Sequence, residues 1–132
     1  PFSTVYEVPM SDQIFIAQSR VIHRLAGHGP CVIVGRCADM VLKDEQCLNL
    51  FFYANFKKRV QRLMEREKLP ESEVKQMEKR VREIDRKRRD YYQYYTGNEW
   101  GKPQNYHLCL DSHKAGMEAC IDAAVAYMHH LE

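Results

Sequence analysis

CLNLFFYA, residues 47–54, is a short apolar run that is rich in aromatic side chains. A run of this length and composition is typical of a strand buried on both faces, as in a parallel sheet. Two more stretches share this character, Cys31–Val34 within PCVIVGR and Asn105–Ser112, which reads NYHLCLDS. Helical patterns separate the three runs, and strands that alternate with helices predict an α/β fold with a parallel sheet.

Four segments carry the apolar spacing of amphipathic helices. The first covers about residues 12–26, and the second runs from a capping Asn55 to about Lys68. The third begins near Pro70 and continues to about Tyr95, with Gly97 just beyond its end. The fourth covers residues 115–130, and its apolar positions are Met117, Ile121, Val125 and Met128.

The bulk composition describes one ordinary globular domain. The chain has 132 residues, of which 45% are hydrophobic and 29% charged. No apolar stretch approaches the roughly 20 residues that cross a bilayer, so no membrane partner is predicted. The five cysteines form no CxxC pair and have no metal-ligand spacing with histidines, which favours reduced thiols in a cytoplasmic protein and no metal site.

The positive charge is local to one helical region. Residues 57–90 hold 14 Lys and Arg against 8 Asp and Glu, whereas the rest of the chain holds 6 against 10. A surplus of this kind points to an anionic partner. Phosphate is the first candidate, because the two-pronged guanidinium of arginine matches it.

An arginine interrupts the apolar seam of the third helix. Positions spaced three and four apart are Val74, Met77, Val81, Ile84, Arg88, Tyr91 and Tyr95. We expect Arg88 to face inward, where a guanidinium needs a carboxylate, a phosphate or water. The alternative for the neighbouring charges is a solvated helix with pairs such as Asp85–Arg89.

Four other places could carry chemistry. Gly35 permits a sharp turn from which Arg36 and Asp39 would project, either toward a ligand or into a surface ion pair. The stripe formed by Arg59, Arg62 and Arg66 is either a solvated helix face or a contact for nucleotide phosphate.

The third and fourth of these places are a cluster of aromatic residues and the end of the last predicted strand. Tyr91, Tyr92, Tyr94, Tyr95 and Trp100 could stack on bases or form a packed hinge between a mobile helix and the core. Asp111 and Ser112 could border a ligand or cap the next helix. No GxxxxGK[ST] motif occurs, so nothing obvious cradles a nucleoside triphosphate.

Several stretches resemble the cytidylate kinase-like proteins, a branch of the P-loop nucleoside monophosphate kinases. The matching segments are FIAQSRVIHRLA (15–26), GPCVIVGRCADMVL (29–42), IDRKRRDYYQYYTGNEWG (84–101) and NYHLCLDS (105–112). The resemblance implies a P-loop NTPase-like parallel sheet with a helical lid. It further implies transfer of the terminal phosphoryl group of ATP, with Mg²⁺, to CMP or a related nucleoside monophosphate.

The resemblance also assigns roles to residues. It implies that Arg36, Arg82, Arg88 and Arg89 act on the transferred phosphoryl group, and that Arg36, Asp39, Gln18, Arg20 and Asp85 meet the acceptor. ATP would be met by Arg62, Arg66, Arg86 and Ser112. The lid would cover about residues 56–95, and the core would comprise residues 1–55 and 96–132 of one partial kinase domain.

The resemblance leaves the front of the family's domain unmatched, since its members begin with a strand, a phosphate loop and a helix. We therefore expect this chain to be a fragment that lacks the first strand and the P-loop, to be inactive alone and to self-associate through exposed strand edges. Val34 stands where other cytidylate kinases carry an acidic residue near magnesium.

Two functions of other classes remain open. A basic helical hairpin with tyrosines could bind nucleic acid, which the apolar strands and an inward Arg88 make the weaker alternative. The chain could also be a non-catalytic interaction protein that is built on a kinase remnant.

Overall fold

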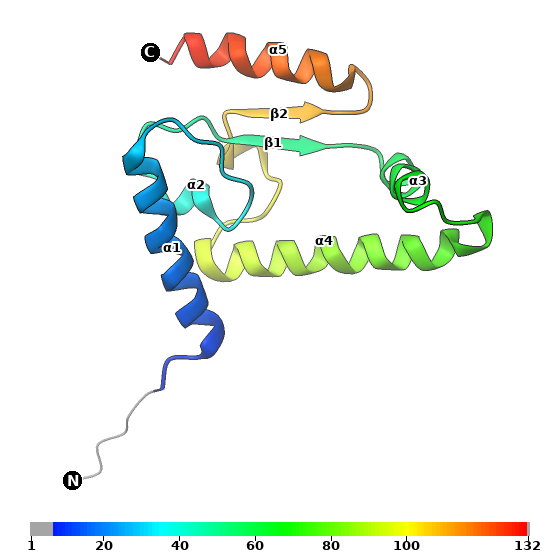
Figure 1. Cartoon of the computed structure of the whole chain (residues 1–132), viewed down its shortest axis with the longest axis horizontal. Helices are drawn as coiled ribbons and strands as arrows, with labels where there is room; N and C mark the ends of the chain where they lie inside the picture. The colour runs from blue at the N-terminus through cyan, green and yellow to red at the C-terminus, as the bar shows by residue number, and fades with distance from the viewer. Residues whose placement is uncertain (1–6, 132) are drawn as a thin grey trace. The chain divides into compact units, whose positions relative to one another are not determined.

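The computed structural model describes residues 7–131, which form two compact units. The first extends to Cys47 and contains the helices α1 (Met10–His28) and α2 (Ala38–Val41). The second starts at Leu48. Its elements are β1 (Leu50–Tyr53), α3 (Phe56–Glu67), the 3₁₀ turn η1 (Glu71–Glu73), α4 (Val74–Thr96), the 3₁₀ turn η2 (Pro103–Asn105), β2 (Leu108–Asp111) and α5 (Gly116–His129) (Figure 1). The predicted division into core and lid is a different one and stays a prediction.

The strands β1 and β2 form a small parallel sheet, as the apolar runs predict. Leu50 lies opposite Leu108 and Tyr53 opposite Asp111. One further backbone hydrogen bond at each end extends the pairing, from His107 N–H to Asn49 at 2.8 Å and from Ser112 N–H to Tyr53 at 2.9 Å. The chain is therefore a helix-rich α/β protein.

Two expectations about strands are wrong. Cys31–Val34 forms no strand, and Val32 and Val34 are 93% and 88% exposed. An extended segment becomes a strand only beside a neighbour that accepts and donates its hydrogen bonds, and within residues 7–131 only β1 and β2 pair. Nor is β1 buried on both faces, since Phe52 and Tyr53 are each 47% exposed.

The two helices α3 and α4 pack as a hairpin around four buried side chains. These are Val60, Met64, Met77 and Val81, each 3–7% exposed, and we call them the hairpin core. Phe56, Leu63 and Val74 pack against them. The three- and four-residue spacing that predicts this packing is thus confirmed for the first half of α4.

The ends of the hairpin helices follow from local chemistry. The side chain of Asn55 accepts a hydrogen bond from Lys57 N–H at 3.0 Å, which confirms it as the cap of α3. Lys68 ends α3 in a left-handed conformation, and Gly97 ends α4 in the same way with φ +71°.

The loop from α4 to β2 is fixed on one ring of β1. The ring of Phe51 lies 5.2 Å from that of Trp100, edge-on, and 4.9 Å from that of Tyr106. Gly101 has φ +79°, and a Cβ atom there would approach Phe51 Cζ to 3.2 Å. The backbone conformation therefore favours glycine at this position, and a larger residue would also press on the Phe51 ring.

The helix α5 packs on β2 through a narrow face. Cys120 is buried, and its Sγ lies 3.9 Å from the Asp111 carbonyl oxygen. Its other apolar positions, Met117, Ile121, Val125 and Met128, are exposed, although the amphipathic pattern suggests a buried stripe. The amphipathic pattern of α1 likewise predicts more buried side chains than the structure shows, because Ile22 is the one buried residue in this helix.

No helix in the described part of the chain, residues 7–131, combines the length and the apolar character that crossing a bilayer requires.

Candidate anion-binding site

The first candidate element is the turn at Gly35. Three successive residues, Gly35, Arg36 and Cys37, have φ values of +69°, +57° and +55°. Such values in non-glycine residues cost roughly 1 kcal/mol or more each, so this turn stores strain. The predicted sharp turn is confirmed, and the Arg36 side chain is exposed.

The thiol of Cys37, which follows Arg36, is expected to be unreactive. Burial of Cys37, and to a lesser extent the charge of Asp39, raises its pKa to about 11. The thiol therefore stays protonated at neutral pH, and because the thiolate is the nucleophile, Cys37 fills space rather than reacting.

Two weaker candidates lie on α1. The Gln18 side chain is half-buried, and its Oε1 atom has no hydrogen-bond partner within residues 7–131. A buried acceptor left unpaired costs roughly 1–3 kcal/mol, and a donor from a ligand would recover that energy. Arg20 is exposed on the same helix.

The inward position expected for Arg88 is wrong. Its side chain is 62% exposed, and one of its Nη atoms lies 3.8 Å from an Asp85 oxygen. The hairpin core ends at Val81, and Arg59, one turn into α3, already lies opposite Asp85. Arg88 is nearly one turn further along α4 than Asp85 and lies beyond the buried part of the hairpin.

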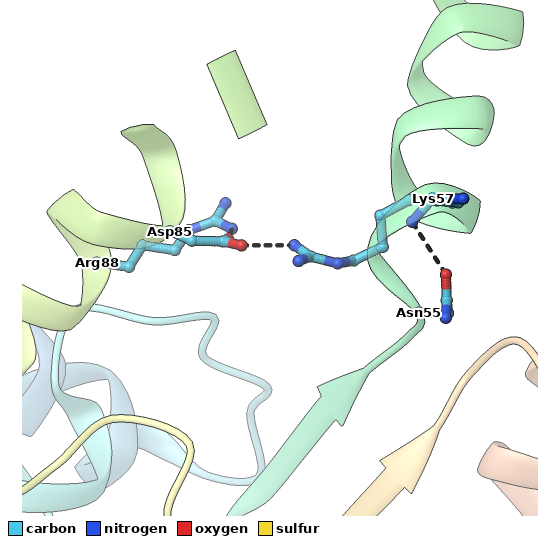
Figure 2. A network of polar contacts seen from close by, with 5 residues as sticks. Asn55, Lys57, Asp85 and Arg88 are labelled. Atoms are coloured by element: carbon cyan, nitrogen blue, oxygen red, sulfur yellow. Dashed lines mark hydrogen bonds and ion pairs between the residues drawn. The ribbon is translucent and has the colours of Figure 1, made fainter. Parts of the chain in front are cut away.

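An ion pair that the sequence analysis missed joins the two helices at this end. Arg59 Nη1 donates a hydrogen bond to Asp85 Oδ2 at 2.8 Å. The dashed line that starts at Asp85 in Figure 2 shows this bond, whereas the one between Lys57 and Asn55 is the cap of α3. The Asp85 side chain is only 14% exposed, and its two oxygens are divided between Arg59 and the more distant Arg88.

An aromatic ring holds two of the guanidiniums. The Cζ atom of Arg82 lies 4.6 Å from the centre of the Phe56 ring, and that of Arg59 lies 5.7 Å from it. Both distances are within cation–π range. We call the five residues Phe56, Arg59, Arg82, Asp85 and Arg88 the arginine knot. Its arrangement could not be predicted, because it depends on which turn of α4 meets Phe56.

The remaining predicted arginines are exposed. Within residues 7–131, no ion pair involves Arg62, Arg66, Arg86 or Arg89. The predicted pair Asp85–Arg89 is therefore not formed, and Asp85 pairs with Arg59 and Arg88 instead. These arginines leave a field of positive charge that can attract an anion.

The tyrosines at the end of α4 pack on one another. The rings of Tyr91 and Tyr95 are 4.8 Å apart and tilted by 59°, and those of Tyr94 and Tyr95 are 4.7 Å apart and nearly perpendicular. Tyr92 is buried. One of these contacts is tilted and the other edge-on, and Tyr94 is 69% exposed, so base stacking and a packed hinge both stay predictions.

The end of β2 is occupied by backbone contacts. The Asp111 carboxylate accepts hydrogen bonds from His113 N–H at 2.9 Å and Lys114 N–H at 3.2 Å, and these bonds lower its pKa. Ser112 Oγ lies 3.3 Å from the Tyr53 carbonyl oxygen. The two bonds to Asp111 hold the turn before α5 and do not cap the helix, because the N-cap residue of α5 is Ala115 and no side chain caps it. The capping alternative for Asp111 is therefore wrong, while a nucleotide contact by Ser112 stays a prediction.

Side chains that commonly bind metals are not clustered in the described part of the chain. Within residues 7–131, no three His, Cys, Asp or Glu side chains are grouped so that they could hold an ion.

The comparison with protein families decides the assignment. A model described as the cytidylate kinase-like family matches residues 2–114. The chain belongs to the cytidylate kinase-like family. Membership indicates a kinase-type phosphotransferase that acts on a nucleotide, which agrees with the arginine-rich hairpin.

A solved structure shares the fold of this cytidylate kinase-like chain. It is the crystal structure of an uncharacterized protein from Eubacterium ventriosum, with 28% sequence identity and a TM-score of 0.80. The match covers 93% of this chain and 68% of that one. No curated protein matches the chain.

Proposed function

We propose that this chain contributes the acceptor side and the lid of a P-loop nucleoside monophosphate kinase. The enzyme would transfer the terminal phosphoryl group of ATP, with Mg²⁺, to CMP or a related pyrimidine nucleoside monophosphate. The observation that carries the proposal is the arginine face of α4 in a member of the cytidylate kinase-like family. Arg82, Arg86 and Arg89 share one face and have no ion-pair partner within residues 7–131.

The chemistry of phosphoryl transfer suits such a face. The transition state spreads negative charge over the oxygens of the transferred group, and catalysis consists mainly of positioning and electrostatic stabilisation. In the proposal, Arg82, Arg88 and Arg89 stabilise that charge. Their side chains form no covalent intermediate, and water is excluded when the lid of about residues 56–95 closes over the core of residues 1–55 and 96–132.

The acceptor and ATP would meet different residues. The acceptor monophosphate would contact Arg36, with Asp39, Gln18, Arg20 and Asp85 around the nucleoside. The phosphates and adenine of ATP would meet Arg62, Arg66, Arg86 and Ser112. Support for this distribution comes from the exposed side chain of Arg36 on its strained turn and the unpaired acceptor of Gln18 on α1.

Two further proposals concern the setting of the protein. A cytoplasmic location suits its five free cysteines. Self-association would cover apolar surface that β1 and α5 leave exposed, and sedimentation velocity of the purified chain would test it.

Calorimetric titration tests the acceptor class. We expect CMP to bind more tightly than cytidine, because the monophosphate supplies the charge that Arg36 would meet. Arg36→Gln should weaken CMP binding by about tenfold, as expected when a charge-assisted hydrogen bond is lost. Arg80→Gln is the matched control, since Arg80 pairs with Glu67 and is assigned no role.

The reaction itself is best followed by ³¹P NMR on the product of the complete gene, with ATP, Mg²⁺ and CMP. Formation of CDP is expected, and Arg89→Gln should lower kcat by about a hundredfold or more, as does removal of one donor to developing charge. Absence of CDP, together with nucleic-acid binding that falls steeply with salt, would favour the nucleic-acid-binding alternative.

A further inference from the structure

We infer that Arg59 is a positioning residue, which orders Arg82 and Arg88 as one anion-binding pair through Phe56 and Asp85. The inference rests on the proposed function, because it assigns a role within the same site. The sequence pattern places Arg59 in a stripe that could contact nucleotide phosphate itself, whereas the inference gives it the different role of holding other arginines in place, and the family resemblance assigns it no role.

Arg59 makes the two contacts that a positioning role requires. Its guanidinium donates to Asp85 at 2.8 Å, and the other Asp85 oxygen lies 3.8 Å from Arg88. The same guanidinium lies 5.7 Å from the Phe56 ring, which also carries Arg82 at 4.6 Å. One side chain from α3 therefore touches both groups that restrain the two arginines of α4.

The ion pairs of Asp85 indicate that it restrains the arginines and does not contribute to attraction of the phosphate. Arg82 and Arg88 carry long side chains that lose much rotamer freedom when they bind a ligand, and restraint before binding lowers that cost. Asp85 is negative and would repel an incoming phosphate if it acted only through charge. Its low exposure and its bonded partner suggest instead that it is retained to hold guanidiniums in place.

The same hairpin offers a matched control at its other end. Arg80 Nη1 donates to Glu67 at 2.8 Å, so this pair also joins α4 to α3 at the same distance. Within residues 7–131, Arg80 has no cation–π contact, and it lies outside the arginine knot. Arg59→Gln and Arg80→Gln thus remove the same charge and one bridge each.

The test measures binding of inorganic tripolyphosphate by calorimetry at fixed ionic strength. We expect Arg59→Gln to weaken binding by about tenfold, the order expected when a charge-assisted hydrogen bond that fixes a binding group is lost. Arg80→Gln should weaken it less than about twofold, because this exposed charge pairs with Glu67, touches neither Phe56 nor Asp85 and contributes only screened attraction. Equal losses in the two variants would overturn the inference.

A second variant, Asp85→Asn, should change the affinity for tripolyphosphate in opposite directions, depending on whether Asp85 acts through its charge or by positioning the arginines. If charge alone matters, Asp85→Asn should tighten tripolyphosphate binding, because a negative charge is removed. If Asp85 positions the arginines, binding should weaken. Tighter binding would overturn the inference, and this variant also carries the test if Arg59→Gln proves to be unfolded by circular dichroism.

Side-chain NMR supplies a measurement that does not depend on the ligand. The Nε–Hε signals of Arg82 and Arg88 should show ordered side chains in the unsubstituted chain and in Arg80→Gln, and mobile ones in Arg59→Gln. Unchanged order in Arg59→Gln would overturn the positioning role. If the unsubstituted chain binds no tripolyphosphate, the proposed function fails and the inference fails with it, whereas equal losses in the two variants refute the inference alone.

Discussion

The α3–α4 hairpin and the β1–β2 sheet bury their apolar side chains to very different extents. The residues of the hairpin core are all buried, whereas Phe52 and Tyr53 of β1 are about half exposed. A helix satisfies its backbone within itself, so two amphipathic helices can close a core between them. A parallel strand depends on neighbours for both its hydrogen bonds and its burial, and two short strands supply few of either.

The largest effect is expected from truncation of a side chain in the hairpin core. Met77→Ala leaves a cavity in the hairpin core, and we expect it to lower the free energy of unfolding by about 2–5 kcal/mol. Met117→Ala is the matched control on α5, where the side chain is 56% exposed, and should change stability by less than about 0.5 kcal/mol. Urea unfolding followed by circular dichroism would compare the two, and similar losses would contradict the contrast.

The next largest change in stability is expected in the loop that connects α4 to β2. Gly101→Ala forces a side chain into φ +79° and against Phe51 at 3.2 Å, so we expect a loss of about 1–3 kcal/mol. Gly27→Ala, within α1 and with open space around it, should instead raise stability by about 0.5–1 kcal/mol. Thermal unfolding of both variants measures the signs, and a gain for Gly101→Ala would show that the loop does not depend on Phe51.

A smaller effect is expected at the start of the hairpin. Asn55→Ala removes the acceptor for Lys57 N–H and should cost about 1 kcal/mol in urea unfolding. Asn55→Asp keeps an acceptor and adds favourable charge at a helix N-terminus, so it should be close to neutral. Equal destabilisation by both changes would mean that the cap bond does not stabilise α3.

The same contrast explains which parts of the fold the sequence could predict. The four long helices follow from local periodicity, and Asn55 and Gly97 mark helix ends by local chemistry. Cys31–Val34 has the composition of a strand but no partner among residues 7–131, and composition alone cannot supply one. A strand is a property of a pair of segments, which is why this prediction failed.

The candidate functional residues also fall into two groups, those that local sequence predicts and those that depend on how distant segments pack. The arginines of the hairpin stand out in the sequence as a charge surplus, and Gly35 marks the separate turn that carries Arg36. The environment of Arg88 could not be deduced, because it depends on where α3 starts relative to α4. The bond between Arg59 and Asp85 joins residues 26 positions apart and emerges only when the two helices pack.

The smallest expected effect sharpens the comparison at the end of β2, where local contacts help to fix the sheet. Hydrogen bonds from His113 and Lys114 lower the pKa of Asp111. A carboxylate whose pKa is lowered by folding stabilises the protein above its unfolded pKa of about 3.9, and that stability is lost as the pH falls through the lower folded value. Asp111→Asn keeps an acceptor but does not titrate, so the difference in melting temperature between the two proteins should shrink from pH 6 to pH 2.5. A difference that stays constant over this range would show that the charge of Asp111 does not stabilise the turn into α5.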